Sequence, residues 1–143
     1  MRYGGNEMEA EEILQTGFIQ LFCHLHQFRF EGSLEGWVLR IFVNTAVNYY
    51  RKNLKYSREI ELSDDFGEES MQGDVLSAIS VKEMLSIIQS LPAGYRTVFN
   101  LYAMEEYKHA EIAEMLGISE GTSKSQLKRA KIMVRRMLKE IEK

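Results

Sequence analysis

Hydrophobic residues recur every three or four positions through most of this chain, and long polar stretches are few. This spacing places one apolar stripe along an α-helix. No segment alternates apolar and polar residues over a convincing strand length, so the sequence predicts an all-α fold. The pattern predicts six helices, over residues 7–26, 34–53, 75–89, 92–104, 108–116 and 119–138.

Residues 54–74 lose the helical spacing and collect Ser, Asp, Glu and Gly. This composition is typical of a linker that is extended by its own charge. The linker would separate a first helical domain, residues 1–53, from a second one, residues 75–143. The predicted architecture is therefore two small helical domains joined by an acidic linker.

The last two predicted helices are joined by a tight turn. Gly117 can end the first of them because glycine readily adopts positive φ after a helix, and Ser119 can cap the second. Ala113 is small where the two helices must approach closely, and the second helix is rich in Lys and Arg. This combination is typical of a DNA-binding helix-turn-helix. A solvated basic helix on an ordinary bundle is the plainer alternative.

The net charge of −3 alone argues against binding to nucleic acid, but the charge is unevenly distributed. Residues 53–80 carry 2 basic and 7 acidic side chains, which gives −5. Residues 119–143 carry 8 basic and 3 acidic side chains, which gives +5. A basic C-terminal helix is thus masked by an acidic middle, and we expect salt-sensitive contacts with DNA phosphates.

Other sequence features argue against a secreted protein, a membrane protein and an enzyme. The single Cys23 rules out an internal disulfide, no stretch approaches the ~20 apolar residues of a membrane span, and a signal peptide is lacking. We therefore expect a soluble cytoplasmic protein without membrane insertion. Cys23, His24 and His26 point in different directions on a helix and cannot share one metal ion comfortably. No nucleophile motif or phosphate-binding glycine loop occurs, so we expect no catalytic residue, metal or cofactor.

Two segments resemble conserved regions of the bacterial RNA polymerase sigma factors, specifically the extracytoplasmic-function (ECF) group. Residues 91–138, with LPAGYRTVFNLY and EIAEMLGISEGTSKSQLKRAK, resemble the fourth region, and residues 10–52, with FEGSLEGWVLRIFVNTAVNYYRK, resemble most of the second. Family members usually have about one more helix before the position of Met1. The resemblance therefore implies a first domain that lacks its N-terminal start, through truncation or a misassigned start. Asn48 replaces a frequent Asp, and Ser123 replaces a frequent Val.

The resemblance implies transcription initiation as the function. Sigma factors bind core RNA polymerase, recognise two promoter elements and help to melt the DNA, and an anti-sigma factor commonly holds them inactive. The acidic linker would occupy the basic channel of the polymerase, or it would be a solvated tether. The alternative is a helix-turn-helix regulator that binds DNA as a dimer without polymerase, which the aromatic-rich first domain fits poorly.

The resemblance also implies which residues contact promoter DNA. In the first domain, the loop before residue 34 would form a pocket for unpaired bases, and polar residues on one helix face would bind bases and phosphate. For Trp37 we favour a role in the domain core, because large aromatic side chains usually pack. The residues for the downstream element and melting are Glu31, Gly32, Ser33, Trp37, Arg40, Asn44, Asn48 and Arg51. The residues for the upstream element, in the major groove, are Thr122, Ser123, Lys124, Ser125, Lys128, Arg129 and Lys131.

Binding to the polymerase core would fall to one face of the first helix. This face offers polar and aromatic contacts to a coiled coil on the polymerase. For Phe18, burial in the core is an equally good interpretation, because buried Phe is common. The residues expected to bind the core are Glu11, Glu12, Gln15, Phe18 and Gln20.

Overall fold

The computed structural model describes residues 1–57 and 79–141 of the 143-residue chain. Within these ranges the regular structure is helical throughout and contains no strand, which confirms the all-α prediction. The elements are α1 (Glu7–His24), the 3-10 helix η1 (Leu25–Gln27), α2 (Leu34–Ser57), α3 (Val81–Ser90), α4 (Ala93–Ala103), α5 (His109–Leu116) and α6 (Glu120–Ile141).

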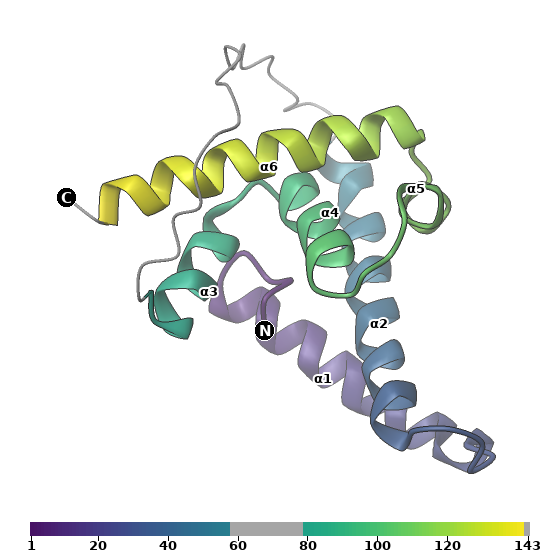
Figure 1. The fold of residues 1–143 in the computed structure, drawn as a ribbon. Coiled ribbons are helices and arrows are strands. Elements are labelled where there is room, and N and C mark those ends of the chain that lie inside the picture. Colours follow the sequence, from purple (N-terminus) through teal and green to yellow (C-terminus); the bar gives the residue numbers. More distant parts are fainter. Residues whose placement is uncertain (58–78, 142–143) are drawn as a thin grey trace.

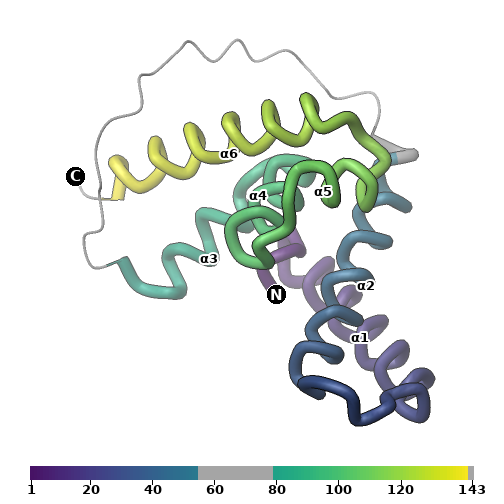
Figure 2. Tube along the Cα trace, turned by 45° about the vertical axis from the view of Figure 1, so that its right-hand side comes forward, coloured from purple at the N-terminus to yellow at the C-terminus, as the bar shows by residue number. Residues whose placement is uncertain are grey.

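The helices form a hairpin and a bundle that pack against each other. Helices α1 and α2 make the hairpin, which projects away from the rest of the molecule at its α1-to-α2 connection (Figure 1). Helix α6 lies across α3 and α4, with its most extensive packing on α4 (Figure 1). The C-terminal part of α2 approaches α4 and α5, so that the hairpin joins the bundle at that end (Figure 2).

A glycine allows the two helices of the hairpin to approach closely. Gly17 is buried on α1, and the ring of Phe42 on α2 packs over it. A Cβ atom at Gly17 would lie 2.5 Å from two ring carbons of Phe42, which is closer than van der Waals contact allows. Phe42 also makes an edge-to-face contact with Phe18, with 5.1 Å between ring centroids. These contacts fix the spacing between α1 and α2.

Side-chain caps set the first residue of several helices. Ser33 Oγ accepts a hydrogen bond from the Gly36 N–H at 3.2 Å, so Ser33 caps α2. Ser80 and Glu83 form a reciprocal capping box at α3, and the Glu83 pKa is lowered by its hydrogen bonds to Ser80. These local interactions explain why α3 begins at Val81.

Two predicted helix boundaries were wrong by four residues or more. Helix α2 continues to Ser57, four residues into the predicted linker. Helix α3 starts at Val81 and not at residue 75, because residues 79 and 80 are not helical and Ser80 caps the helix. On this helix Val81 is 78% exposed, while Ile87 and Ile88 are buried. The rest of the predicted acidic linker and residues 75–78 lie outside the described residues.

The largest buried cluster contains residues from both the hairpin and the bundle. Ile13 of α1 and Val43 of α2 belong to the same core as Val98 and Leu101 of α4 and Ile112 of α5. A second cluster, formed by Ile87, Leu91, Ala130 and Val134, joins α3 to α6. Burial of apolar surface therefore stabilises the contact between hairpin and bundle as well as each part.

The N-terminal segment before α1 is bonded to the bundle through Arg96. This buried arginine donates from Nε to the Tyr3 carbonyl at 2.9 Å, and from Nη1 to the carbonyls of Gln89 and Leu91 at 2.9 and 2.7 Å. Its guanidinium also lies 3.7 Å from the Glu9 carboxylate. One side chain thus joins residues from α1, from the segment before it, and from the end of α3.

Candidate functional site

Helices α5 and α6 form the helix-turn-helix that the sequence predicts. Gly117 has φ +66° and ψ +37°, and this left-handed residue lets the Ile118 N–H bond to the Ala113 carbonyl at 3.0 Å. Ser119 then caps α6, because its Oγ accepts a hydrogen bond from the Thr122 N–H at 3.0 Å. The turn therefore places a short helix directly before the basic helix.

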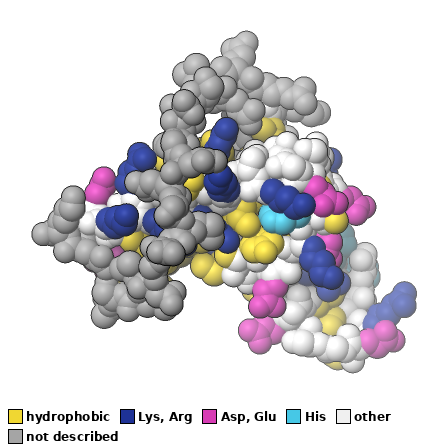
Figure 3. All heavy atoms as spheres, turned by 45° about the horizontal axis from the view of Figure 1, so that its top comes forward, with side chains coloured by type: hydrophobic (Ala, Val, Ile, Leu, Met, Phe, Trp, Pro, Cys, Tyr) yellow, Lys and Arg dark blue, Asp and Glu magenta, His cyan; other side chains and the backbone are white. Residues whose placement is uncertain are grey.

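The exposed face of α6 carries most of the residues predicted to contact the upstream element. Lys124, Ser125, Lys128, Arg129 and Lys131 are all exposed. Positions 124 and 131 are about 10 Å apart along the helix axis, at 1.5 Å per residue. Viewed from the α6 side, several Lys and Arg side chains are visible at the surface (Figure 3). The arrangement suits a helix that lies in the major groove of DNA.

Two tyrosines of α4 contact the cations of this face, and sequence reasoning missed both. The Tyr95 hydroxyl accepts a hydrogen bond from Arg129 Nη1 at 3.2 Å. The Lys131 ammonium lies 5.6 Å from the centre of the Tyr102 ring, within the range of a cation–π interaction. Tyr95 and Tyr102 are seven residues apart and so share one helix face. This spacing was the signal in the sequence that could have identified them.

Ser123 corrects the predicted set of DNA contacts. It is 0% exposed, so its side chain cannot touch DNA, and its Oγ lies 2.8 Å from Nδ1 of His109 on α5. Gln126, another polar residue of the same helix, is buried as well. Both residues continue the inward stripe of Leu127, Ala130 and Val134, because positions three or four apart share one helix face. Thr122 is half-buried, and its hydroxyl lies 2.9 Å from that of Ser119.

A groove of about 540 Å³ runs between α1 and α2. It is lined by three of the residues predicted for strand opening, Trp37, Asn44 and Asn48, and both asparagines are exposed. Arg40 and Arg51 are exposed on the same helix but do not line the groove. The full lining is Glu12, Ile13, Thr16, Gln20, His24, Gln27, Trp37, Ile41, Asn44, Thr45, Asn48, Tyr49 and Lys52. Amide, hydroxyl and aromatic groups therefore face one open cavity, which suits an unpaired base.

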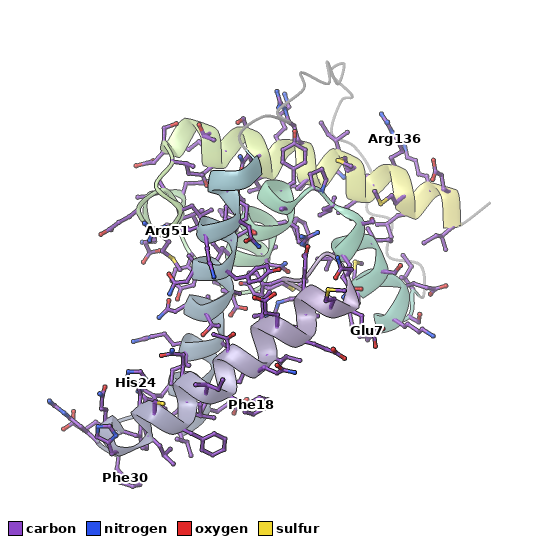
Figure 4. The ribbon with its side chains drawn as sticks, turned by 180° about the vertical axis from the view of Figure 1, so that it is seen from behind. Glu7, Phe18, His24, Phe30, Arg51 and Arg136 are labelled. Carbon is purple, nitrogen blue, oxygen red and sulfur yellow. The ribbon has the colours of Figure 1, made fainter. Side chains whose placement is uncertain are left out.

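The loop between η1 and α2 adds an exposed aromatic residue. Glu31, Gly32 and Ser33 are exposed, as a binding loop requires. Phe30 is 88% exposed and has φ +57°, a conformation that costs a residue with a Cβ about 1–2 kcal/mol. It lies at the tip of the hairpin (Figure 4).

Phe28 links this exposed ring to the groove. Its ring centroid lies 5.1 Å from that of Phe30 and 5.4 Å from that of Trp37. Trp37 is half-buried, so it packs against Phe28 and also lines the groove. Phe30 was not among the residues predicted for strand opening, although Phe28 and Phe30 both lie within three residues of Glu31.

The five residues predicted to bind polymerase are all exposed but do not share one face. Glu12 and Gln20 line the groove, whereas Phe18 lies on another side of α1 against Phe42. The prediction of a single face was wrong because positions 18 and 20 are about 160° apart around a helix. Glu11 and Gln15 lie on the Phe18 side by the same geometry. Phe18 is 48% exposed, so it is only partly a core residue (Figure 4).

No helix in residues 1–57 and 79–141 is both long and apolar enough to span a bilayer. In the same ranges, no three His, Cys, Asp or Glu side chains are grouped so that they could bind a metal ion.

Comparison with known proteins assigns both ends of the chain to one family. The Sigma-70 region 2 profile matches residues 1–55, and the Sigma-70, region 4 profile matches residues 82–134. The first range contains the α1–α2 hairpin up to residue 55, and the second contains all of α3 but its first residue, α4, α5 and most of α6. The groove and the basic helix thus lie in separate conserved regions.

Individual relatives give the subfamily. The chain is 31% identical to the ECF RNA polymerase sigma factor SigM of Bacillus subtilis, over 85% of this chain and 75% of SigM. It is 30% identical to the ECF RNA polymerase sigma factor SigW of the same organism, over 96% of this chain and 79% of SigW. The solved structure of the sigma factor RpoE in complex with the anti-sigma factor NepR, from Bartonella quintana, is similar in fold, with a TM-score of 0.56 and 21% identity over 96% of this chain and 86% of that one. This chain belongs to the ECF family of RNA polymerase sigma factors.

Proposed function

We propose that this sigma factor divides promoter recognition between its two ends. Helix α6 would read the upstream element as duplex DNA, and the α1–α2 groove with the adjoining loop would bind bases of the opened downstream element. As an ECF sigma factor the chain binds core RNA polymerase and promoter DNA, and the alternative of a regulator that acts without polymerase is not favoured. Its role is to direct initiation, without a catalytic residue or cofactor of its own.

The observation that carries the proposal is the separation of charge and apolar surface on α6. Lys124, Lys128 and Arg129 are exposed, while Leu127, Ala130 and Val134 are buried against the bundle. A helix held in this way presents its cations together to a polyanion, and each phosphate contact releases counterions. Arg129 is the best placed to read a base, since Arg pairs with guanine through two hydrogen bonds.

Strand opening is supported by the chemistry of the groove and loop. Unstacking a base costs a few kcal/mol, so the protein must favour the unpaired form. Stacking on an aromatic ring contributes about 1–3 kcal/mol per base, and Phe30 offers an exposed ring. Asn44 and Asn48 can bond to base edges from the groove, while Arg40 and Arg51 lie where they can bind phosphate. Ser33, Gly32 and Glu31 would form the rim of the pocket.

We assign core binding to the Phe18 side of α1. Glu11, Gln15 and Phe18 are exposed there, together with Phe22. Glu12 and Gln20 line the groove instead and would act near the opened DNA. Because the RpoE structure contains the anti-sigma factor NepR, we also propose that an anti-sigma factor binds this chain. The protein would act in the cytoplasm together with polymerase.

The double variant Asn44→Ala with Asn48→Ala tests the strand-opening role. It should bind core polymerase and the upstream element normally, yet initiate poorly on duplex promoters and recover on templates with a mismatched bubble. The helix should persist because Ala is a better helix former than Asn. Permanganate footprinting measures unpaired thymines directly. A matched control changes Lys82 and Ser86, also exposed and four residues apart, to Ala on α3. Thymine reactivity equal to that of the control would refute the role of this face.

A further inference from the structure

We infer that His109 is a positioning residue for promoter reading. It would not contact DNA itself but would fix the orientation of α6 through the buried hydroxyl of Ser123. This inference rests on the proposed reading of duplex DNA by α6, and it names a residue to which neither the family comparison nor the sequence assigns a role.

The hydrogen bond between His109 and Ser123 joins the two helices of the helix-turn-helix. Ser123 is completely buried in the inward stripe of α6, and its Oγ lies 2.8 Å from His109 Nδ1 at the first residue of α5. A buried hydroxyl without a partner destabilises its surroundings, so this contact constrains where α6 can lie. Ser123 directly precedes Lys124 and Ser125, so a shift of this residue would move the DNA-facing residues with it.

His109 also connects to the other end of the DNA-facing segment. Its ring stacks on Tyr102 of α4, with 4.7 Å between centroids and an interplanar angle of 22°. The same Tyr102 ring contacts the Lys131 ammonium at 5.6 Å. Ser123 and Lys131 are eight residues apart, which is about 12 Å along the helix. The contacts therefore connect Ser123 of α6 to His109 of α5, then to Tyr102 of α4, and finally to Lys131 of α6. Ser123 and Lys131 lie on either side of residues 124–129.

The electrostatic surroundings of His109 fit a positioning role. Burial lowers the pKa of His109, and the charges of Lys124 and Lys131 lower it further, while Glu120 opposes them. The imidazole is therefore neutral at pH 7 and adds no charge for phosphate binding. Nδ1 of a neutral ring can accept a hydrogen bond from the Ser123 hydroxyl or donate one to its oxygen, depending on the tautomer. Either bond gives the hydroxyl a partner.

Four variants separate the hydrogen bond from the ring contact. His109→Phe keeps a ring on Tyr102 but leaves the Ser123 hydroxyl without its partner. His109→Asn removes the ring but keeps a hydrogen-bonding group near the position of Nδ1. Ser123→Ala removes the hydroxyl, and the double variant His109→Phe with Ser123→Ala removes both polar groups, which forms a double-mutant cycle. Circular dichroism identifies a temperature at which every variant is folded, and binding is measured at that temperature.

The full chain, assembled with core RNA polymerase, is assayed on two duplexes. The first is enriched by the wild-type assembly from a pool with a randomised upstream element, and the second has the enriched element scrambled. The readout is the ratio of the two affinities at several salt concentrations. A residue that only stabilised the fold would not change this ratio in folded protein, whereas a residue that orients the reading helix would.

We expect His109→Phe to lower the ratio about tenfold, as the loss of a partner for one buried hydroxyl implies. Affinity for the scrambled duplex and its salt dependence should stay unchanged, because the phosphate-binding cations remain. The double variant should regain most of the ratio, and His109→Asn should retain it.

Three results would overturn the inference: a wild-type ratio for His109→Phe, an equal loss on both duplexes, or a double variant no better than His109→Phe. Failure of His109→Asn to keep the ratio would also count against the inference. This variant can therefore still refute the inference if His109→Phe does not fold. If the wild-type assembly enriches no sequence, duplex reading by α6 fails and this inference fails with it. If it enriches one and His109→Phe behaves like wild type, the positioning role alone fails.

Discussion

Replacing Arg96 with Met should destabilise the whole chain, because this side chain connects the N-terminal segment to the bundle. Met keeps a flexible apolar stem of similar length and so preserves much of the packing. It removes the guanidinium, which donates to the carbonyls of Tyr3, Gln89 and Leu91. The change therefore tests the hydrogen bonds with little loss of volume.

The expected loss is about 3 kcal/mol of unfolding free energy. The bonds to Tyr3 and Leu91 are buried, and each carbonyl left without a partner costs about 1–3 kcal/mol. The bond to Gln89 is only partly buried, so water can replace it. Glu9 is one-third exposed and 3.7 Å away, so its contribution is small. Burial of the charged guanidinium is itself unfavourable, and it lowers the pKa of Arg96. Removal of this buried charge therefore offsets part of the cost.

Urea unfolding followed by circular dichroism measures this change. The slope of the unfolding free energy against urea concentration should stay the same. Arg40→Met is the matched control, because Arg40 is exposed and its loss should change stability by less than about 0.5 kcal/mol. A loss below about 1 kcal/mol for Arg96→Met would refute the reasoning, since it would mean that water satisfies these carbonyls equally well.

Three further changes have defined outcomes. Phe30→Ala should reduce permanganate reactivity of promoter thymines by removing about 1–3 kcal/mol of base stacking, while Phe30→Trp should retain it; equal reactivity in both would exclude stacking. Tyr95→Phe should reduce discrimination between upstream elements a few-fold at an unchanged melting temperature, as measured by fluorescence anisotropy, because Arg129 loses a hydrogen-bonding partner. The folded pKa of His109 lies below its usual 6.5, so the unfolded chain binds more protons near pH 6 and stability falls as the pH drops below about 6.5. The stability difference between wild type and His109→Phe, from urea titrations at pH 5 to 8, should therefore shrink at low pH, and a constant difference would contradict the shift.

Local signals in the sequence predicted the parts of the site that depend on neighbouring residues. Gly117 and Ser119 specify the turn and cap of the helix-turn-helix, because positive φ and side-chain capping involve residues only a few positions apart. The Ser33 cap of α2 is local in the same way, because it bonds to a residue three positions away. The exposed position of Lys124 and Lys128 followed from helical spacing alone.

Features that depend on packing between distant segments could not be predicted in this way. Arg96 bonds to Tyr3, 93 residues away, and nothing near either residue indicates the pairing. Ser123 looked like a polar residue at the DNA-facing end of α6, but its partner His109 lies on another helix and allows the hydroxyl to be buried. The split of the predicted polymerase face is different, since helical geometry already places Phe18 and Gln20 about 160° apart.

Transcription by core RNA polymerase with and without this chain tests the central claim most directly. The template is a pool of linear duplexes with a randomised promoter region, and sequencing of the run-off RNA identifies the start sites. With the chain added, we expect new start sites whose templates share two sequence elements at a constant spacing, and core polymerase alone should give none of them. Identical start sites with and without the chain, together with no binding of the chain to core polymerase, would contradict its function as a sigma factor.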